Sequence, residues 1–266
     1  MLAVATCLAV PAHGHGVVSE KIRQISAEIA KTPDNGPLYM KRGRLYLDEA
    51  RYRRAMADFR KALRIAPDLH SAWYFLAQAQ LGAKQPARAE ISARRFMSNL
   101  VDSDRGGHIR AHLLLGQVLT ARGKLDRAAD HYYRAFVLSE TPRPRDVIAL
   151  ATTLARANRT DDALRAIDAG IARLGSLVTL ERHALRLETG AGRYDAAQAR
   201  LDRLIADSEM PAGWMLEKAR LLRDRGDEGT ARQIAARGLH VLADLPATRR
   251  RTPAMRELQA ELQALR

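Results

Sequence analysis

Histidines at two places in the sequence have a spacing that metal chemistry could use. His108 and His112 are four residues apart, so a helix would present both imidazoles on one face, where they could share a metal ion. No third ligand accompanies them, and His112 falls at a position that packing against a neighbouring helix would bury. We therefore interpret this pair as part of the core rather than as a metal site.

The second place is the segment His13-Gly14-His15. If a leader were removed after Ala12, the new amino terminus would combine a free amine, two backbone amides and the imidazole of His15. This set suits square-planar Cu(II) or Ni(II). His13 and His15 are therefore candidate metal-binding residues, and the alternative is a flexible terminus that binds nothing.

Motifs for catalysis are missing from the sequence. It contains no glycine-rich phosphate loop, no G-x-S-x-G turn and no H-E-x-x-H helix. The single cysteine, Cys7, lies in an apolar leader and cannot form an internal disulfide. We predict that the chain is not an enzyme and uses no cofactor and no small-molecule substrate.

Residues 1–16, MLAVATCLAVPAHGHG, form a signal-like or disordered leader, with an apolar run that ends in small residues. The run is too short to span a bilayer, so we do not expect a membrane-spanning protein. The pattern predicts export to a bacterial periplasm or secretion, with a cytoplasmic protein as the alternative. It leaves open whether Cys7 is lipidated.

The 266 residues carry a net charge of +14, and the sequence pI is about 10.5. Such a balance favours acidic partners, although an arginine-rich composition can also follow from a GC-rich genome. Nucleic-acid binding needs aromatic side chains that are free to stack on bases. Tyr46, Phe59, Trp73 and Tyr132 fall at packing positions of the repeat described next. We therefore do not expect nucleic acid, and a polyanion-binding protein is the alternative function.

A fixed spacing of small and aromatic residues recurs along the chain. In the segment YMKRGRLYLDEARYRRAMADFRKALRIAP, Gly43 precedes Phe59 by sixteen residues, and Gly116 precedes Tyr132 by the same interval. Repeats of about 34 residues are helix–turn–helix hairpins that must stack to bury their apolar faces. The second repeat ends in VDSDRGG, which we interpret as a loop insertion. The predicted repeats are 36–69, 70–108, 109–143, 144–177, 178–211 and 212–243.

One position in the repeats predicts the turn between the paired helices. Gly123, Gly192 and Gly226 occupy it in three repeats, and Asn158 occupies it in a fourth. Glycine and asparagine tolerate the left-handed backbone conformation that ends many helices.

The recurring residues resemble those of the tetratricopeptide repeat (TPR) superfamily over residues 36–243. The resemblance implies an all-α, right-handed superhelical solenoid of about six repeats that serves as a protein–protein interaction scaffold. Three residues depart from the family pattern: Arg42 stands where leucine is preferred, Glu181 stands at a usually apolar position, and Trp214 comes one position early.

Both ends of the repeat array carry further helical patterns. Residues 17–35 predict a lead helix with Ile22, Ile25 and Ile29 on one face. Residues 244–266 predict a basic linker and a helix that begins at a Thr252 cap and Pro253. We interpret this last helix as a cap on the open end of the stack, and a partner-binding helix is the alternative.

The resemblance also implies that the first helix of each repeat lines a concave groove. The groove residues in that register are Met40, Arg44, Tyr74, Gln78, Leu113, Gln117, Ile148, Thr152, Arg182, Arg186, Leu216 and Arg220, with Arg223 one turn beyond. The first half is apolar and amide-rich and the second half is basic. This predicts an extended peptide or protein partner with an acidic part, because arginine can donate two hydrogen bonds to one carboxylate. The alternative is that the arginines are solvated or pair with Glu181, Glu188 and Glu217.

Overall fold

The structure is a computed structural model that describes residues 13–266, with side chains from residue 17 onward. Most of the predicted leader, including Cys7, lies outside the described residues, and so do the side chains of His13 and His15. The chain divides into two compact units, Met1–Asn158 and Arg159–Arg266. The division falls at the turn inside the fourth predicted repeat.

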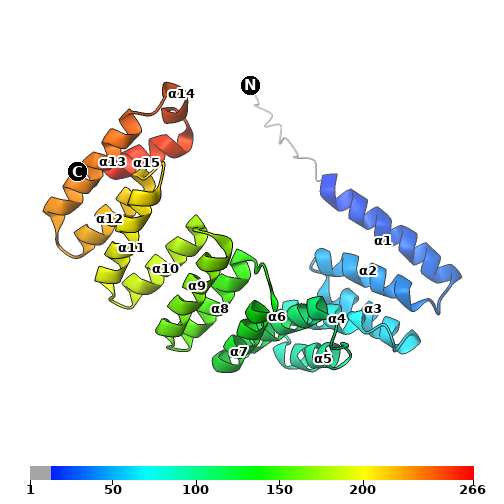
Figure 1. Cartoon of the computed structure of the whole chain (residues 1–266). Coiled ribbons are helices and arrows are strands. Elements are labelled where there is room, and N and C mark those ends of the chain that lie inside the picture. Colours follow the sequence, from blue (N-terminus) through cyan, green and yellow to red (C-terminus); the bar gives the residue numbers. More distant parts are fainter. Residues whose placement is uncertain (1–12) are drawn as a thin grey trace, which may run out of the picture. The chain divides into compact units, whose positions relative to one another are not determined.

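The first unit is a series of helices in which each packs against the next (Figure 1). Within its described residues every regular element is a helix, as the all-α prediction requires. The lead helix is followed by hairpins α2–α3, α4–α5 and α6–α7 and by the single helix α8. The bounds are α1 (His13–Lys31), α2 (Gly36–Asp48), α3 (Tyr52–Ile65), α4 (Ser71–Gly82), α5 (Pro86–Ser98), α6 (Arg105–Ala121), α7 (Leu125–Leu138) and α8 (Pro144–Arg156).

The second unit continues the same pattern and ends in a cap. The last long helix, α15, packs against α12 and α13 and buries Leu262 among their apolar side chains. Thr252 accepts a hydrogen bond from the backbone N–H of Met255, as expected for the helix cap. The bounds are α9 (Thr160–Leu174), α10 (Val178–Gly190), α11 (Tyr194–Asp207), α12 (Ala212–Asp224), α13 (Glu228–Ala243), α14 (Ala247–Arg250) and α15 (Pro253–Gln263).

The paired helices approach closely where the sequence places glycine. A Cβ atom added to Gly43 would lie 2.8 Å from the ring of Phe59, and one added to Gly116 would lie 2.8 Å from the ring of Tyr132. Glycine therefore leaves the space that the aromatic ring of the second helix occupies. Phe59 is completely buried, so its spacing from Gly43 reflects packing rather than ligand binding.

The predicted turn residues have the left-handed conformation. Gly123, Gly192 and Gly226 have φ between 71° and 84°, and Asn158 has φ 60°. Two further turns, which we did not predict from the sequence, adopt the same conformation at residues other than glycine or asparagine. Ala50 has φ 54° and Lys84 has φ 57°, although side chains with a Cβ are strained there.

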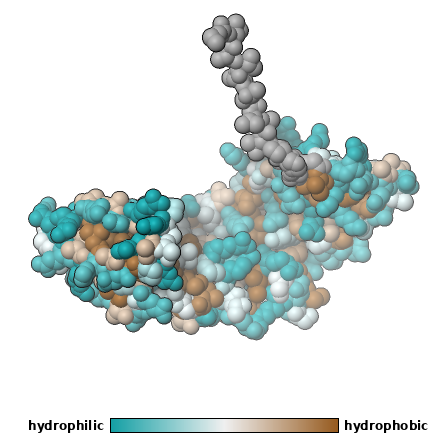
Figure 2. All heavy atoms as spheres, turned by 90° about the horizontal axis from the view of Figure 1, so that it is seen from above, coloured by the Kyte–Doolittle hydropathy of each residue, from teal (hydrophilic) through white to brown (hydrophobic). Residues whose placement is uncertain are grey.

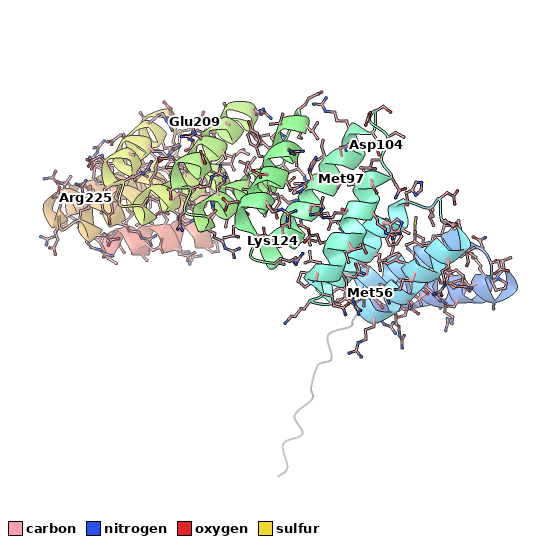
Figure 3. The ribbon with its side chains drawn as sticks, turned by 90° about the horizontal axis from the view of Figure 1, so that it is seen from below. Met56, Met97, Asp104, Lys124, Glu209 and Arg225 are labelled. Carbon is pink, nitrogen blue, oxygen red and sulfur yellow. The ribbon has the colours of Figure 1, made fainter. Side chains whose placement is uncertain are left out.

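The insertion VDSDRGG is only partly a loop, so our expectation was wrong for its last three residues. Helix α6 begins at Arg105, inside the insertion, and Asp104 lies at its N-terminal end (Figure 3). The side chain of Asp104 accepts a hydrogen bond of 2.7 Å from the backbone N–H of Gly107. This cap satisfies a free N–H of the first turn and extends the helix toward the N-terminus.

The lead helix also differs in its bounds from the predicted 17–35. It covers His13–Lys31, and Thr32 ends it because the residue before a proline disfavours the helical conformation. Ile22 and Ile29 are buried and Ile25 is half-buried. The side of the described surface seen in Figure 2 is largely hydrophilic, with small separate hydrophobic areas.

Candidate functional site

The predicted groove residues of the first unit lie on first helices that contact one another. Helix α4 packs against both α2 and α6, so the three first helices are neighbours. The guanidinium of Arg44 in α2 lies 5.0 Å from the ring centre of Phe75 in α4. The hydroxyl of Ser71 in α4 lies 3.5 Å from the sulfur of Met40 in α2. We call the exposed side of these helices, with Met40, Arg44 and Gln117, the first-helix face.

Tyr74 and Gln78 form a linked pair at the centre of this face. The amide of Gln78 donates a hydrogen bond of 3.1 Å to the hydroxyl of Tyr74. The ring of Tyr74 packs edge-on against Phe75 and lies 5.3 Å from the ring of Phe96. Both residues are half-buried, so their polar groups are held in place and remain accessible.

The remaining predicted residues of the first unit differ in accessibility. Gln117 in α6 is exposed, whereas Leu113, one turn earlier, is buried in the core. Ile148 and Thr152 in α8 are half-buried. Leu113 therefore contributes to packing, and Gln117 is available to a ligand.

In the second unit, two of the four predicted arginines have carboxylate partners. Arg182 in α10 lies 3.7 Å from Glu217 in α12. Arg220 in α12 donates a hydrogen bond of 3.0 Å to Glu261 in α15. The pairing expected as the alternative therefore occurs for Arg182 with Glu217, and Arg220 pairs with Glu261 of the capping helix.

The other two arginines have different surroundings. A guanidinium nitrogen of Arg186 lies 2.9 Å from Nδ1 of His183, and burial together with this charge lowers the pKa of His183. Arg223 is exposed. Among the described residues, neither Arg186 nor Arg223 has a carboxylate within ion-pair distance. Leu216, also predicted to face the groove, is buried in the core beside Leu262.

Glu181 and Glu188 pair with Arg200, a residue that the sequence had not singled out. The guanidinium of Arg200 donates to Glu188 at 2.9 Å, to Glu181 at 3.1 Å and to Asp168 at 3.0 Å. Burial opposes the charge on Arg200, but the hydrogen bonds to Glu188 and Asp168 outweigh this effect and raise its pKa. Glu181 also accepts a hydrogen bond from Ser176. This network explains how a carboxylate occupies an apolar position of the repeat.

Arg42, another departure from the repeat pattern, also has a structural role. It donates two hydrogen bonds of 2.8 Å to Asp58 in α3 and one of 3.0 Å to Ser26 in α1. Arg42 therefore joins the lead helix to the first hairpin. Trp214 packs against a buried cluster that includes Leu201, so its shifted position still serves the core.

The neighbour of His112 is a third histidine, His131, rather than His108, which stands four residues before it in the sequence. Nδ1 of His112 lies 2.9 Å from Nδ1 of His131 in α7, whereas His108 contacts the carbonyl of Val101. Burial and the neighbouring His131 and Arg134 lower the pKa of His112 to about 4. Among the described residues, no three His, Cys, Asp or Glu side chains gather closely enough to hold a metal ion.

Comparisons with known proteins agree with the repeat spacing. A family model described as tetratricopeptide repeat matches residues 36–69, and a second model with the same description matches residues 91–142 and 184–244. Together these matches cover more than half of the chain. The chain belongs to the tetratricopeptide repeat family. A comparison with curated proteins gives no match.

Solved structures with a similar fold include several TPR proteins. YrrB, a TPR protein with an unusual peptide-binding site, is 18% identical, with a TM-score of 0.54 over 68% of this chain and 91% of its own. The pilF protein of Pseudomonas aeruginosa is 19% identical, with a TM-score of 0.53 over 86% and 98%. A TPR protein of Parabacteroides merdae is 13% identical, with a TM-score of 0.56 over 94% and 93%. At these identities the likeness concerns the fold alone. No helix among the described residues is long and apolar enough to cross a membrane.

Proposed function

We propose that this TPR protein is a non-catalytic scaffold that binds a peptide or protein partner on its first helices. The contact of α4 with both α2 and α6 carries the proposal, because it joins side chains from three repeats into one continuous face. On that face Arg44 and Gln117 are exposed, and Tyr74 and Gln78 present positioned polar groups. An extended peptide could contact all of them while each helix keeps its own packing.

The partner has an acidic part, which the first helices of the second unit bind. Arg186 in α10 and Arg223 in α12 are the basis for this proposal, because both are exposed and unpaired with carboxylates among the described residues. A carboxylate would receive charge-assisted hydrogen bonds from either guanidinium. Arg182 and Arg220 could bind the partner's carboxylates only if their ion pairs with Glu217 and Glu261 were broken.

Selection from a random peptide library displayed on phage tests this function. We expect peptides selected on the native chain to be enriched in Asp and Glu, and we expect one group of them to bind Arg186→Glu with Arg223→Glu at least tenfold more weakly. Arg237→Glu with Arg249→Glu is the matched control, because both residues are exposed and lie outside the first helices. Selected peptides that lack acidic residues would contradict the proposal, and so would a selection in which no acidic peptide binds Arg186→Glu with Arg223→Glu more weakly than the native chain. Far-ultraviolet circular dichroism checks that the helices are intact.

Export is a separate part of the proposal and rests on the leader alone. We propose that residues 1–12 are removed and that the mature protein works in the periplasm or outside the cell. Mass spectrometry of the protein from its native host should then identify His13 as the first residue. A terminus at any other residue would remove the Cu(II) or Ni(II) site proposed for His13 and His15, and an intact leader would contradict export.

A further inference from the structure

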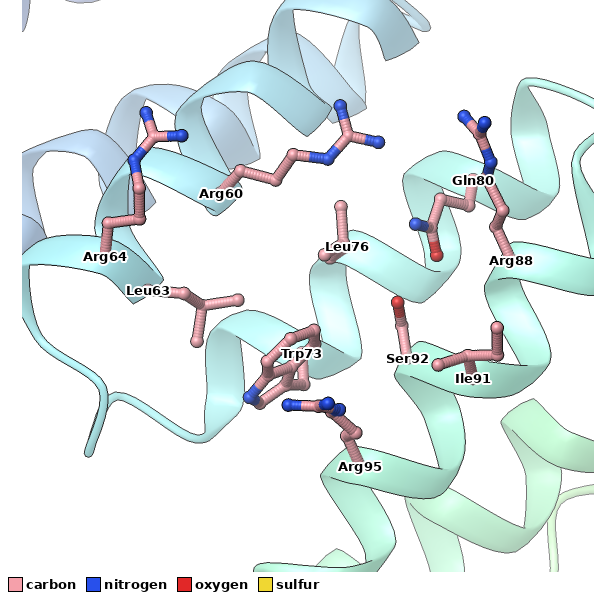
Figure 4. Close-up of a pocket in the computed structure, with 10 residues that line it drawn as sticks. All are labelled: Arg60, Leu63, Arg64, Trp73, Leu76, Gln80, Arg88, Ile91, Ser92 and Arg95. Atoms are coloured by element: carbon pink, nitrogen blue, oxygen red, sulfur yellow. The ribbon is translucent and has the colours of Figure 1, made fainter.

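A second groove lies on the other side of the first unit, between α3 and α5. Its first pocket has a volume of about 530 Å³, and α4 provides Trp73, Leu76 and Gln80 to its lining (Figure 4). The predicted groove residues on the same helix are Tyr74 and Gln78. Residues two apart on a helix point about 200° apart, so the two sets face opposite sides of α4.

An adjoining pocket of about 490 Å³ extends this space along α4. It shares Leu63, Trp73 and Arg95 with the first pocket and continues to Asn99. We call the two pockets together the α3–α5 groove. Between His70 and Gln80 the groove follows about 15 Å of helix, a length that about four or five residues of extended polypeptide would span.

The α3–α5 groove is strongly basic. No acidic residue lines either pocket. The acidic side chains of the flanking helices are engaged elsewhere, since Asp58 binds Arg42 and Glu90 binds Arg94 and Arg122. Within the part of the chain that the structure describes, the four arginines of the first pocket form no ion pair. These arginines are Arg60, Arg64, Arg88 and Arg95.

One buried polar atom in this groove lacks a hydrogen-bond partner. Gln80 is 4% exposed, and its Oε1 is the single buried side-chain oxygen or nitrogen without a partner among the described residues. Buried oxygens are nearly always hydrogen-bonded. The last torsion of a glutamine is soft, so the amide can turn toward a donor that enters the pocket. The missing partner points to an occupant that carries an N–H or O–H group.

The rest of the lining is apolar. Leu63 and Leu76 form the inner wall, and Ile91 stands at the rim with 61% of its surface exposed. Trp73 lies beside Arg95, whose guanidinium is 5.0 Å from the ring centre. Arg95 stacks on Trp73, the single Trp, Tyr or Phe ring in the lining, so a stacked base would compete with this guanidinium. An occupant with carboxylates, backbone N–H groups and an apolar side chain fits this lining better than a nucleic acid.

We propose that the α3–α5 groove binds a short, extended, acidic segment of a second polypeptide. Its carboxylates pair with the four arginines, a backbone N–H satisfies Gln80, and an apolar side chain packs on Leu63 and Leu76. This site is independent of the first-helix face, so the scaffold has binding surfaces on two sides.

Tryptophan fluorescence offers a local test. The chain has two tryptophans, Trp73 in the groove and Trp214 in the second unit. In the full chain with Trp214→Phe, we expect a pool of capped short peptides made of Asp, Glu, Leu and Phe to change the Trp73 emission saturably. A pool with Asn and Gln in place of the acids should bind at least tenfold more weakly. If Trp214→Phe does not fold, the Trp73 response is obtained by subtracting the fluorescence response of Trp73→Phe from that of the native chain.

Charge reversals then locate the binding. Arg60→Glu with Arg88→Glu should weaken the response at least tenfold, because both guanidinium groups border the pocket and neither has an acidic partner to lose. The matched control is Arg53→Glu with Arg110→Glu, at exposed positions outside both pockets. Arg186→Glu with Arg223→Glu should leave the Trp73 response unchanged, which separates this site from the proposed function.

Three results would overturn the proposal. One is an absent or non-saturable response to the acidic pool, and another is an equal response to the amide pool. The third is a saturable response to single-stranded DNA, phosphatidylglycerol vesicles or inorganic phosphate that exceeds the response to the acidic pool, which would assign the groove to a phosphate ligand.

Discussion

Arg200 binds three carboxylates from two neighbouring helices inside the second unit. Its side chain is 9% exposed, and the side chains of Glu181 and Glu188 are 2% and 6% exposed. Charges at such depth are tolerated only when they are paired and hydrogen-bonded. Arg200 thus permits Glu181 at a position where a TPR hairpin usually places an apolar residue.

Removal of this guanidinium should destabilise the protein. We expect Arg200→Met to lower the free energy of unfolding by about 3–5 kcal/mol, because two buried carboxylates lose their main partner. Urea denaturation followed by circular dichroism measures the change. Arg203→Met is the control, since Arg203 is exposed and 3.9 Å from Glu181, and it should cost less than about 1 kcal/mol. Equal losses for both variants would contradict the role assigned to Arg200.

The contact between His112 and His131 predicts a pH dependence of stability. The pKa of His112 is lowered to about 4 in the folded protein, mainly by burial, and the pKa of His131 is lowered as well. The unfolded chain therefore binds protons first as the pH falls below about 6.5. Stability should be full above that pH and should fall by about 2 kcal/mol near pH 5 from His112 alone.

Urea denaturation of the native chain and His112→Gln at several pH values measures this effect. The native chain should lose more stability than His112→Gln between pH 7 and 5, because the variant lacks the titrating group. Parallel curves for the two proteins would contradict the assignment.

At the scale of single elements, the turns offer a test of backbone strain. Lys84 has φ 57° and an exposed side chain. Lys84→Gly should stabilise the protein by about 0.5–1 kcal/mol, since glycine adopts this conformation freely. Gly123→Ala should destabilise it by about 1 kcal/mol, although nothing lies within 4 Å of the added Cβ. Thermal unfolding of both variants checks the opposite signs, and two changes of the same sign would refute the explanation.

Replacing a helical glycine by alanine should change the stability in opposite directions at Gly43 and at Gly190. Gly43→Ala places a Cβ 2.8 Å from Phe59 and should cost about 1–3 kcal/mol through displacement of the buried ring. Gly190 is the last residue of α10 and meets no atom within 4 Å, so Gly190→Ala should stabilise the helix by less than the ~1 kcal/mol expected in a helix interior. Calorimetry of the two variants measures both effects. A neutral Gly43→Ala would show that the hairpin does not depend on this close approach.

At the scale of the whole molecule, the repeat packing could be predicted from the sequence because it depends on residues of one hairpin. Gly43 and Phe59 lie sixteen residues apart, and the same contact recurs between Gly116 and Tyr132. The ion-pair partners of the groove arginines in the second unit could not be predicted in the same way. Arg220 meets Glu261, which is 41 residues away in a helix outside the repeats. No periodicity in the sequence marks such a pair.

The α3–α5 groove could not be predicted from the sequence for a related reason. The four arginines that border it stand on the second helices α3 and α5, and we had sought groove residues only on the first helices. Only the arrangement of three helices shows that these charges surround Gln80 and Trp73. Trp73 and Gln80, in an uncharged helix between two arginine-rich helices, were the available signals.

We expect this TPR chain to bind partners on two separate sides. Trp73 fluorescence of the full-length Trp214→Phe variant tests it in the presence of a saturating library-selected peptide for the first helices. The acidic pool should still produce its full response, with an unchanged midpoint. Loss of the response, or a midpoint that rises in proportion to the concentration of the selected peptide, would mean that the two ligands share a single site.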